Sequence, residues 1–283
     1  MTDVRDEAAT VAATGKRDAA AGGFIWYELM TPDPIAAKAF YDSVVGWSIG
    51  SDTVAPGLEY RMIGRSDGGN AGGVLTLDAA MAANGARPCW LGYVAVGDVD
   101  DTVAKATAAG ATVLMPAWDQ PGVGRLAMIA DPQGAPLYLM DPLPPEDPAQ
   151  ASDAFSPDQP QHVRWNELST TDPDAAIAFY TGLFGWEQQG EMDMGEMGAY
   201  RFIQHDGVGI GAVMPKMPQM PQMPASLWSY YIGVDDIDRA AAAITDGGGT
   251  ILNGPMEIPG GEFALNALDP QQAAFGLVGP RKS

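Results

Sequence analysis

Two glutamates occupy positions where the sequence predicts a buried β-strand, and their surroundings are nearly the same. Glu28 lies in IWYELMTPDP, which begins at Ile25, and Glu167 lies in RWNELSTTDP, which begins at Arg164. In both segments a predicted strand runs into a predicted helix. An ionised carboxylate in an apolar interior is costly unless a partner or a proton compensates for its charge. These two carboxylates are therefore the first candidates for chemistry.

Three kinds of compensation would make such glutamates tolerable. Arg61 and Arg201 each follow a tyrosine in a predicted strand and would close a buried ion pair. A ligand with an amine, amide or hydroxyl would supply a donor instead, and the arginines would then line its site. A pKa raised by burial would make Glu28 or Glu167 a general acid or base, the catalytic role we expect for them in an enzyme. A purely architectural ion pair is the alternative.

Aromatic residues accompany the glutamates. Four tryptophans lie in predicted strands: Trp26, Trp165, Trp90 and Trp228. Because side chains alternate across a strand, Trp26 shares a face with Glu28, and the second copy repeats this arrangement. The tryptophans suit a flat platform for an aromatic ligand, and they suit an ordinary core as well.

The chain repeats itself at an offset of 165 − 26 = 139 residues. Trp-x-Glu-Leu, Asp-Pro, Phe-Tyr and Gly-Trp recur in this order, and a run rich in proline and acidic residues separates the copies. Repetition at one spacing indicates a tandem duplication. We therefore expect a disordered tail over residues 1–21, a first domain over 22–142, a linker over 143–161 and a second domain over 162–280.

Each copy contains the same order of elements twice, namely a strand, a helix and three strands. In the first copy we expect a strand over residues 24–30 and then a helix that Asp33 caps, with Pro34 in its first turn. Gly46 ends this helix, and the order restarts with a strand at Trp90. The predicted fold class is α+β, built from four βαβββ modules.

These motifs resemble the vicinal oxygen chelate superfamily, which includes glyoxalase I, bleomycin-resistance proteins and extradiol dioxygenases. In the first copy three stretches carry the resemblance: Phe40-Tyr41 with Gly46-Trp47, residues 96–100 and residues 131–134. The Trp-x-Glu-Leu opening is similar to a two-domain glyoxalase-like group. The resemblance implies tandem domains, each with two modules that form a cup-shaped, mostly antiparallel sheet around the ligand. It selects no reaction, because the fold hosts isomerases, dioxygenases, lyases and drug-binding proteins.

The resemblance also implies four metal-ligand positions in each domain. In this chain they fall on residues that bind hard cations poorly: Trp26, residues 72–75, Gly92 and Tyr138 in the first copy, and Trp165, residues 211–214, Tyr230 and Gly276 in the second. We therefore expect no metal and no other cofactor. Tyr138 and Tyr230, which the resemblance directs into the cups, become ligand-binding candidates, with a role in the core as their alternative.

Two further features lie outside this set. His162 and His205 are the only histidines, and we expect both to be exposed on loops. The stretch KMPQMPQMPAS, residues 216–226, suits an adaptable flap near the rim of the second cup, or a tolerated loop expansion.

Composition sets the expected partners. The formal net charge of −21 disfavours nucleic acid and membrane surfaces. Cys89 is the sole cysteine, which is typical of a reducing compartment, and residues 1–21 lack the apolar stretch of a signal peptide. We expect a cytoplasmic monomer or homodimer whose partner is a small molecule.

Three functions fit these observations. The leading hypothesis is a glyoxalase/bleomycin-resistance-like protein that binds a small organic molecule in metal-free cups, with Glu28 and Glu167 as anchors. The alternative is a lyase or isomerase that uses one glutamate as general base on a carbonyl-containing substrate. The third is an interaction scaffold whose cups are filled by side chains. The sequence leaves open whether modules pair within or between the copies, and whether both cups function.

Overall fold

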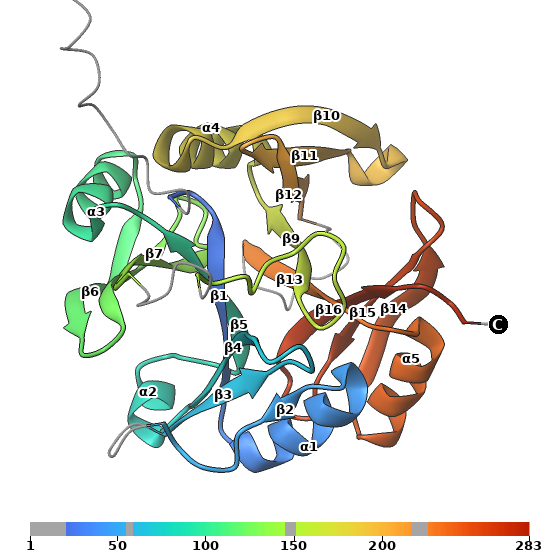
Figure 1. The fold of residues 1–283 in the computed structure, drawn as a ribbon. Helices are drawn as coiled ribbons and strands as arrows, with labels where there is room; N and C mark the ends of the chain where they lie inside the picture. The colour runs from blue at the N-terminus through green and yellow to red at the C-terminus, as the bar shows by residue number, and fades with distance from the viewer. Residues whose placement is uncertain (1–20, 55–58, 145–150, 217–225, 283) are drawn as a thin grey trace, which may run out of the picture.

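The computed structural model describes residues 21–54, 59–144, 151–216 and 226–282, and Figure 1 shows its fold. The first half of the chain contains β1 (Phe24–Thr31), α1 (Pro34–Val45), β2 (Ser48–Ile49), β3 (Tyr60–Gly64), β4 (Asn70–Thr76), α2 (Ala79–Ala83), β5 (Cys89–Ala95), α3 (Val99–Ala108), β6 (Thr112–Gln120), β7 (Gly124–Ala130) and β8 (Pro136–Pro142). The second half contains β9 (Val163–Thr170), α4 (Pro173–Phe184), β10 (Glu187–Asp193), the short 3-10 helix η2 (Gly195–Met197), β11 (Ala199–His205), β12 (Val208–Pro215), β13 (Leu227–Gly233), α5 (Ile237–Asp246), β14 (Thr250–Glu257), β15 (Phe263–Leu268) and β16 (Ala274–Gly279).

Each half of the chain forms its own eight-stranded sheet. The strand orders are β2-β3-β4-β1-β5-β8-β7-β6 and β10-β11-β12-β9-β13-β16-β15-β14. The two modules of a half meet where β1 pairs antiparallel with β5, and where β9 pairs antiparallel with β13. Modules therefore pair within each copy, which the sequence left open. The predicted α+β class with tandem two-module domains is confirmed.

Local sequence signals set the helix boundaries. Asp33 accepts a hydrogen bond from the Ala36 backbone N–H at the start of α1, and Gly46 ends the helix with φ 83°. Asp172 and Gly185, with φ 71°, do the same for α4. Only glycine adopts this left-handed conformation without steric cost, so the helices stop at these points. Each helix then leads into the next strand of its sheet.

The helices connect the two domains. Helix α1 packs against α5, and α3 packs against α4. One hydrophobic core runs through both halves, from Phe24 and Tyr41 in the first to Tyr180 and Phe275 in the second. The Tyr41 and Phe275 rings lie 5.4 Å apart. The face of each sheet that carries its helices is therefore buried between the domains.

Reciprocal hydrogen bonds seal this interface. The Tyr41 hydroxyl donates to Asp269 Oδ2 at 3.1 Å, and the Tyr180 hydroxyl donates to Asp131 Oδ2 at 3.0 Å. Asp131 and Asp269 belong to the two Asp-Pro turns that the repeat analysis matched. A second pair of bonds runs from Trp47 Nε1 to the carbonyl of residue 161 and from Trp186 Nε1 to that of residue 22. Repeated residues thus bond across the interface in both directions.

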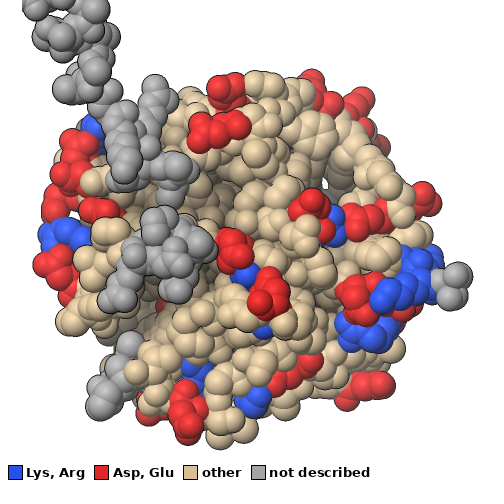
Figure 2. All heavy atoms as spheres, in the orientation of Figure 1, with Lys and Arg blue, Asp and Glu red and all other residues tan. Residues whose placement is uncertain are grey.

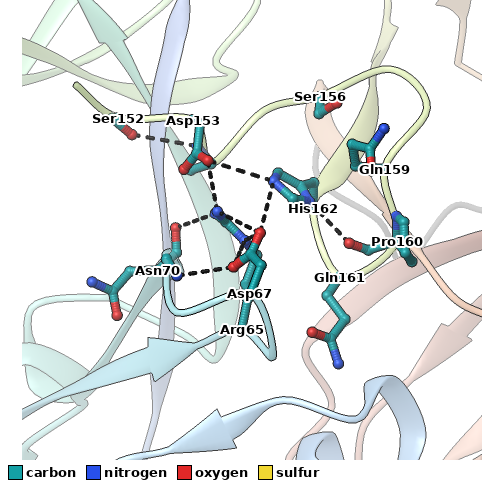
Figure 3. A network of polar contacts seen from close by, with 12 residues as sticks. Arg65, Asp67, Asn70, Ser152, Asp153, Ser156, Gln159, Pro160, Gln161 and His162 are labelled. Atoms are coloured by element: carbon teal, nitrogen blue, oxygen red, sulfur yellow. Dashed lines mark hydrogen bonds and ion pairs between the residues drawn. The ribbon is translucent and has the colours of Figure 1, made fainter. Parts of the chain in front are cut away.

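The segment that leads into β9 is fixed to the first domain. Arg65 donates from Nη2 to Asp67 Oδ2 at 3.1 Å and to Asp153 Oδ2 at 2.7 Å, as Figure 3 shows. Ser152 Oγ donates to the carbonyl oxygen of Ile25. The end of the predicted linker is therefore held against β1 and against the turn between β3 and β4.

The prediction for the histidines was wrong. His162 is only 5% exposed, and its Nδ1 lies 2.9 Å from the carbonyl oxygen of Pro160. His205 is half-buried at the end of β11. His162 lies beside Asp67 and Asp153, and His205 lies against Gly22 before β1. These neighbours are distant in sequence, so local sequence does not reveal them. The stretch predicted as a flap falls largely outside the described residues, as does the tail over 1–20.

Candidate ligand-binding site

The opening strand of each sheet presents its tryptophan and glutamate on one face. We call the face of the first sheet with Trp26, Glu28 and Tyr93 the first cup. The corresponding face of the second sheet, with Trp165, Glu167 and Tyr231, is the second cup. The first cup holds its own apolar cluster, separate from the core between the domains. This cluster draws on six of the eight strands of the sheet, from Leu75 on β4 to Trp118 on the edge strand β6.

Glu28 lies at the centre of the first cup and is 3% exposed. The Tyr93 hydroxyl donates to its Oε2 at 2.8 Å. Its other oxygen, Oε1, is buried and has no hydrogen-bond partner among the described residues. Burial raises the pKa of Glu28 to about 7 from its ordinary value of 4.5, although the hydroxyls of Tyr93 and Tyr60 act in the opposite direction. Near neutral pH the protonated and the ionised forms of this carboxyl are therefore both populated.

A second tyrosine, Tyr60, lies near Glu28 beside the donor Tyr93. Trp26 Nε1 donates to the Tyr60 hydroxyl at 2.7 Å and thereby orients it. The Tyr60 ring lies against the backbone of Gly73, where an added Cβ would come within 2.2 Å of the ring. Burial, and then the charge of Glu28, raise the pKa values of Tyr60 and Tyr93 well above 10. Both hydroxyls therefore keep their protons at physiological pH.

The far wall of the first cup is aromatic and rich in sulfur. The rings of Tyr93 and Tyr138 stack with centroids 4.3 Å apart and planes inclined by 21°. Trp118 meets Tyr138 edge-on at 6.2 Å. Four methionines and the only cysteine pack against the same cluster or belong to it: Met30, Met81, Met128, Met140 and Cys89. Methionine is pliable and polarisable, and it makes favourable contacts with aromatic rings.

The second cup satisfies its glutamate internally. The Tyr200 hydroxyl donates to Glu167 Oε2 at 2.8 Å, and the Tyr231 hydroxyl donates to Oε1 at 3.2 Å. Asn266 Nδ2 donates to the Tyr231 hydroxyl at 2.9 Å, and Trp165 Nε1 donates to that of Tyr200 at 2.7 Å. Burial raises the pKa of Glu167, while the two tyrosine hydroxyls lower it. Neither carboxylate oxygen of Glu167 is left without a donor.

The arginines predicted to pair with the glutamates bind elsewhere. Arg61 Nη1 donates to the carbonyl oxygens of Gly50 and Ser51. Arg201 forms ion pairs with Asp174 and Glu191. Alternation across the strand explains the correction, because in Tyr-Arg the tyrosine faces the cup and the arginine faces away. The adjacent Tyr60 and Tyr200 are the residues that reach the cups.

Three other predicted site residues lie in the core between the domains. Trp90 Nε1 donates to the Tyr41 hydroxyl at 3.0 Å, and Trp228 Nε1 donates to that of Tyr180 at 3.0 Å. Tyr230 is also in this core, where its hydroxyl accepts a hydrogen bond from the Gly92 N–H at 2.7 Å. For Trp90 and Trp228 the core was the alternative to a ligand platform. For Tyr230 the family-based count missed by one residue, and a shift of one residue along a strand moves a side chain to the other face. Trp26, Trp165 and Tyr138 do lie on the cup faces.

The residues of these strands that face the cups are Tyr93 and Tyr231, one position after those that the family resemblance indicated. They follow Gly92 and Tyr230 directly, and each bonds the glutamate of its own cup. The available signal was the period-two pattern itself. Once Trp90 and Trp228 are assigned to the core, the residues three positions later face the cup.

The donor set of the first cup does not fit the divalent metal that the fold family implies. At the predicted ligand positions Trp26 Nε1 is a donor already used by Tyr60, Gly92 has no side chain, and Tyr138 keeps its proton because burial raises its pKa. Among the described residues one group has metal-ligand spacing, namely Asp67, Asp153 and His162. The Arg65 guanidinium already binds both of those carboxylates (Figure 3). We derive no reaction step through a metal.

Comparison with known proteins defines the class. Residues 23–138 and 159–276 each match the model of the Glyoxalase/Bleomycin resistance protein/Dioxygenase superfamily. The chain therefore belongs to this superfamily, and each domain carries one copy of its characteristic unit. Among the described residues no helix is long and apolar enough to cross a membrane.

Two groups of relatives extend along almost the whole chain. "Putative glyoxylase CFP32" of Mycobacterium tuberculosis is 33% identical over 259 residues, which cover 90% of this chain and 94% of the relative. "Anthracycline biosynthesis protein DnrV" of Streptomyces peucetius is 28% identical over 288 residues, which cover 92% and 94%.

Solved structures share the fold. The Mn(II)-bound glyoxalase from Novosphingobium aromaticivorans aligns with a TM-score of 0.59 at 15% identity, covering 93% of this chain and 83% of that one. Homoprotocatechuate 2,3-dioxygenase from Brevibacterium fuscum aligns with a TM-score of 0.61 at 14% identity, covering 92% and 80%. At this level of identity the likeness concerns the fold alone.

Proposed function

We propose that this protein binds a small organic molecule in its first cup, without a metal, and that Glu28 is the polar anchor. The observation that carries the proposal is the buried Glu28 Oε1 without a hydrogen-bond partner among the described residues. Leaving a buried polar atom unpaired costs about 1–3 kcal/mol, and more for a charged group. A ligand that donates to Oε1 removes this cost on binding.

The surroundings of Glu28 support the same reading. The Tyr93 hydroxyl bonds Oε2 and leaves Oε1 as the acceptor without a partner among the described residues. A rigid acceptor in an apolar setting gives a ligand orientation at little entropic cost. The names of the relatives, a glyoxylase and an anthracycline biosynthesis protein, agree with a role in the handling of small molecules.

A thermal-shift screen against metabolites and antibiotics, with and without Mn²⁺ or Ni²⁺, tests the proposal. A ligand should raise the Tm of the wild-type protein equally in the presence of metal and of a chelator. Glu28→Gln should remove most of the shift, and Glu167→Gln should change it less. A shift that requires metal, or one that survives Glu28→Gln intact, would contradict the proposal. If side chains of the protein fill the cup, no compound in the screen should raise the Tm.

A second function is favoured by the pKa of Glu28, which burial raises to about 7. A carboxylate with this pKa is suited to remove a proton from carbon next to a carbonyl group, as in a lyase or isomerase, because general bases work best near the operating pH. Turnover would then rise with pH around 7, and Glu28→Gln would abolish it. Turnover that persists in Glu28→Gln would exclude this role.

A further inference from the structure

The positive charges of the first domain are all engaged away from Glu28. Each of its described basic residues bonds or pairs with another group: Lys38, Arg61, Arg65, Arg87, Lys105 and Arg125. No basic side chain therefore compensates for the charge of Glu28 among the described residues. The compensating donor must come from the ligand, or from a proton on the carboxyl group itself.

The lack of a basic side chain near Glu28 among the described residues disfavours an anionic ligand. A carboxylate or phosphate placed near Glu28 would meet like charge and no described cation. The whole chain has a net charge of −21, and on the face seen in Figure 2 acidic side chains outnumber basic ones. Such a surface favours neutral and cationic molecules over anions during approach.

The walls of the first cup favour a flat ring system. Tyr93 and Tyr138 present a stacked pair, Trp118 stands beside it, and Trp26 lies on the strand that carries Glu28. Aromatic rings prefer offset-stacked and edge-to-face contacts with other rings. The methionine side chains around them can adapt to the outline of a ring, because their long unbranched chains are pliable.

The second cup lacks these features at the equivalent positions. Gly276 pairs with Tyr231 where Tyr138 pairs with Tyr93. Asn266 takes the position that Met128 holds in the first sheet, because Asn266 pairs with Gly276 as Met128 pairs with Tyr138. The second cup has aromatic contacts on its other side, where Phe202 lies 6.3 Å from Trp165 and 5.8 Å from Tyr200. The stacked tyrosine pair and the carboxylate oxygen without a partner thus occur together in the first cup, and the second cup has neither among the described residues.

From this coincidence we infer that the first cup selects a flat aromatic molecule that carries one hydrogen-bond donor, a hydroxyl or an amine, and no anionic group. The donor bonds Glu28 Oε1, and the ring lies against the aromatic and methionine walls. This inference rests on the proposed function and specifies its ligand class.

Four naphthalene-sized probes test the class with the full-length protein. They are 2-naphthol, 2-methoxynaphthalene without the donor, decahydro-2-naphthol without the flat ring, and 2-naphthoic acid with an anion. We expect 2-naphthol to bind at least about tenfold more tightly than each of the others, since a hydrogen bond to a charged group is worth ~1.5–3 kcal/mol. Affinities are measured by isothermal titration calorimetry at pH 8, where Glu28 is ionised.

Two variants locate the donor contact. Glu28→Met removes the acceptor and adds one more methionine to the cluster, so 2-naphthol and 2-methoxynaphthalene should bind it equally. Glu28→Gln keeps a neutral acceptor and should retain a reduced preference for 2-naphthol. It serves as the second test if Glu28→Met fails to fold.

The outcomes separate the two proposals. If 2-methoxynaphthalene or decahydro-2-naphthol matches 2-naphthol on the wild-type protein, the ligand class is wrong. If the naphthalenes fail but the broad screen finds a ligand that depends on Glu28, the proposed function stands and the aromatic class falls. If no small molecule binds the wild-type protein, both fall.

Discussion

The two cups are built from equivalent residues, yet they treat the same carboxylate differently. Glu167 receives one tyrosine hydroxyl on each oxygen, whereas Glu28 receives one on Oε2 and none on Oε1. Glu28 is also the more deeply buried of the two. A duplicated sequence motif therefore does not guarantee a duplicated site. The neighbours of the motif decide whether the acid is structural or available to a ligand.

One small residue helps to explain the difference. Gly73 lets the Tyr60 ring lie directly on β4, beside Glu28. The equivalent position on β12 is Ala212, which pairs with Glu167. An added Cβ at Gly73 would meet the Tyr60 ring, whereas Ala212 carries a Cβ at the equivalent position of a sheet in which the Tyr200 hydroxyl bonds Glu167. The Gly73 and Ala212 positions therefore differ by one methyl group next to the glutamate of each cup.

The largest expected effect is the pH dependence that Glu28 imposes on stability. Its folded pKa of about 7 lies above the unfolded value of 4.5, so the native state holds the proton more tightly. The destabilising contribution is absent below about pH 4.5, grows between pH 4.5 and 7, and reaches about 3 kcal/mol above that range. Urea unfolding of the wild-type protein and of Glu28→Gln across this range measures it. Parallel curves for the two proteins would contradict the prediction.

Removal of the two acids should next distinguish the cups. Glu167→Met leaves the hydroxyls of Tyr200 and Tyr231 without their acceptor and should cost about 2–3 kcal/mol of unfolding free energy at pH 8. Glu28→Met should cost about 1 kcal/mol or less, because loss of the Tyr93 hydrogen bond is offset by removal of a buried charge. Equal losses of unfolding free energy in the two variants, measured by chemical denaturation, would contradict the distinction between a structural Glu167 and a Glu28 that is available to a ligand.

The glycine on β4 offers a sharper comparison. In Gly73→Ala the new Cβ would come within 2.2 Å of the Tyr60 ring, so the ring must move, and we expect a loss of about 1–3 kcal/mol. The reciprocal Ala212→Gly creates no clash and should cost about 1 kcal/mol or less. Thermal unfolding of both variants measures the difference. A harmless Gly73→Ala would show that Tyr60 does not depend on this contact.

The smallest effect concerns the only thiol. Burial, and then the charge of Glu28, raise the pKa of Cys89 to about 12. Alkylation by iodoacetamide at pH 8, followed by intact-mass spectrometry, should therefore be far slower than for a free thiol, because the thiolate is the reactive form. Glu28→Gln removes the charge but not the burial, so it should speed the alkylation of Cys89 modestly. Rapid modification of the wild-type protein would argue against a buried first cup.

The sequence predicted most of the fold because its signals are local. Asp33, Pro34 and Gly46 define a helix by capping chemistry alone, and repetition then transfers the assignment to the second copy. The glutamates were also assigned to the cup face, because alternation along a single strand needs no knowledge of distant residues.

The partners of the glutamates were harder to predict because they depend on distant strands. Tyr93 lies 65 residues from Glu28, and its orientation depends on a register that no local signal fixes to one residue. The prediction that Arg61 would pair with a buried glutamate was wrong, because opposite charge does not reveal which face of a strand a residue occupies. The buried His162 was missed for a similar reason, because the segment that covers it is a linker.

The crossed bonds of Tyr41 with Asp269 and of Tyr180 with Asp131 have a consequence for how the chain must be made. Either half, expressed by itself, would expose the apolar surface that the other half normally covers. It would also expose a tyrosine and an aspartate without their hydrogen-bond partners. Such a fragment should precipitate or pair with a second copy of itself. Two halves produced as separate polypeptides should instead recover a native-like particle when mixed, much as the two subunits of a heterodimer do.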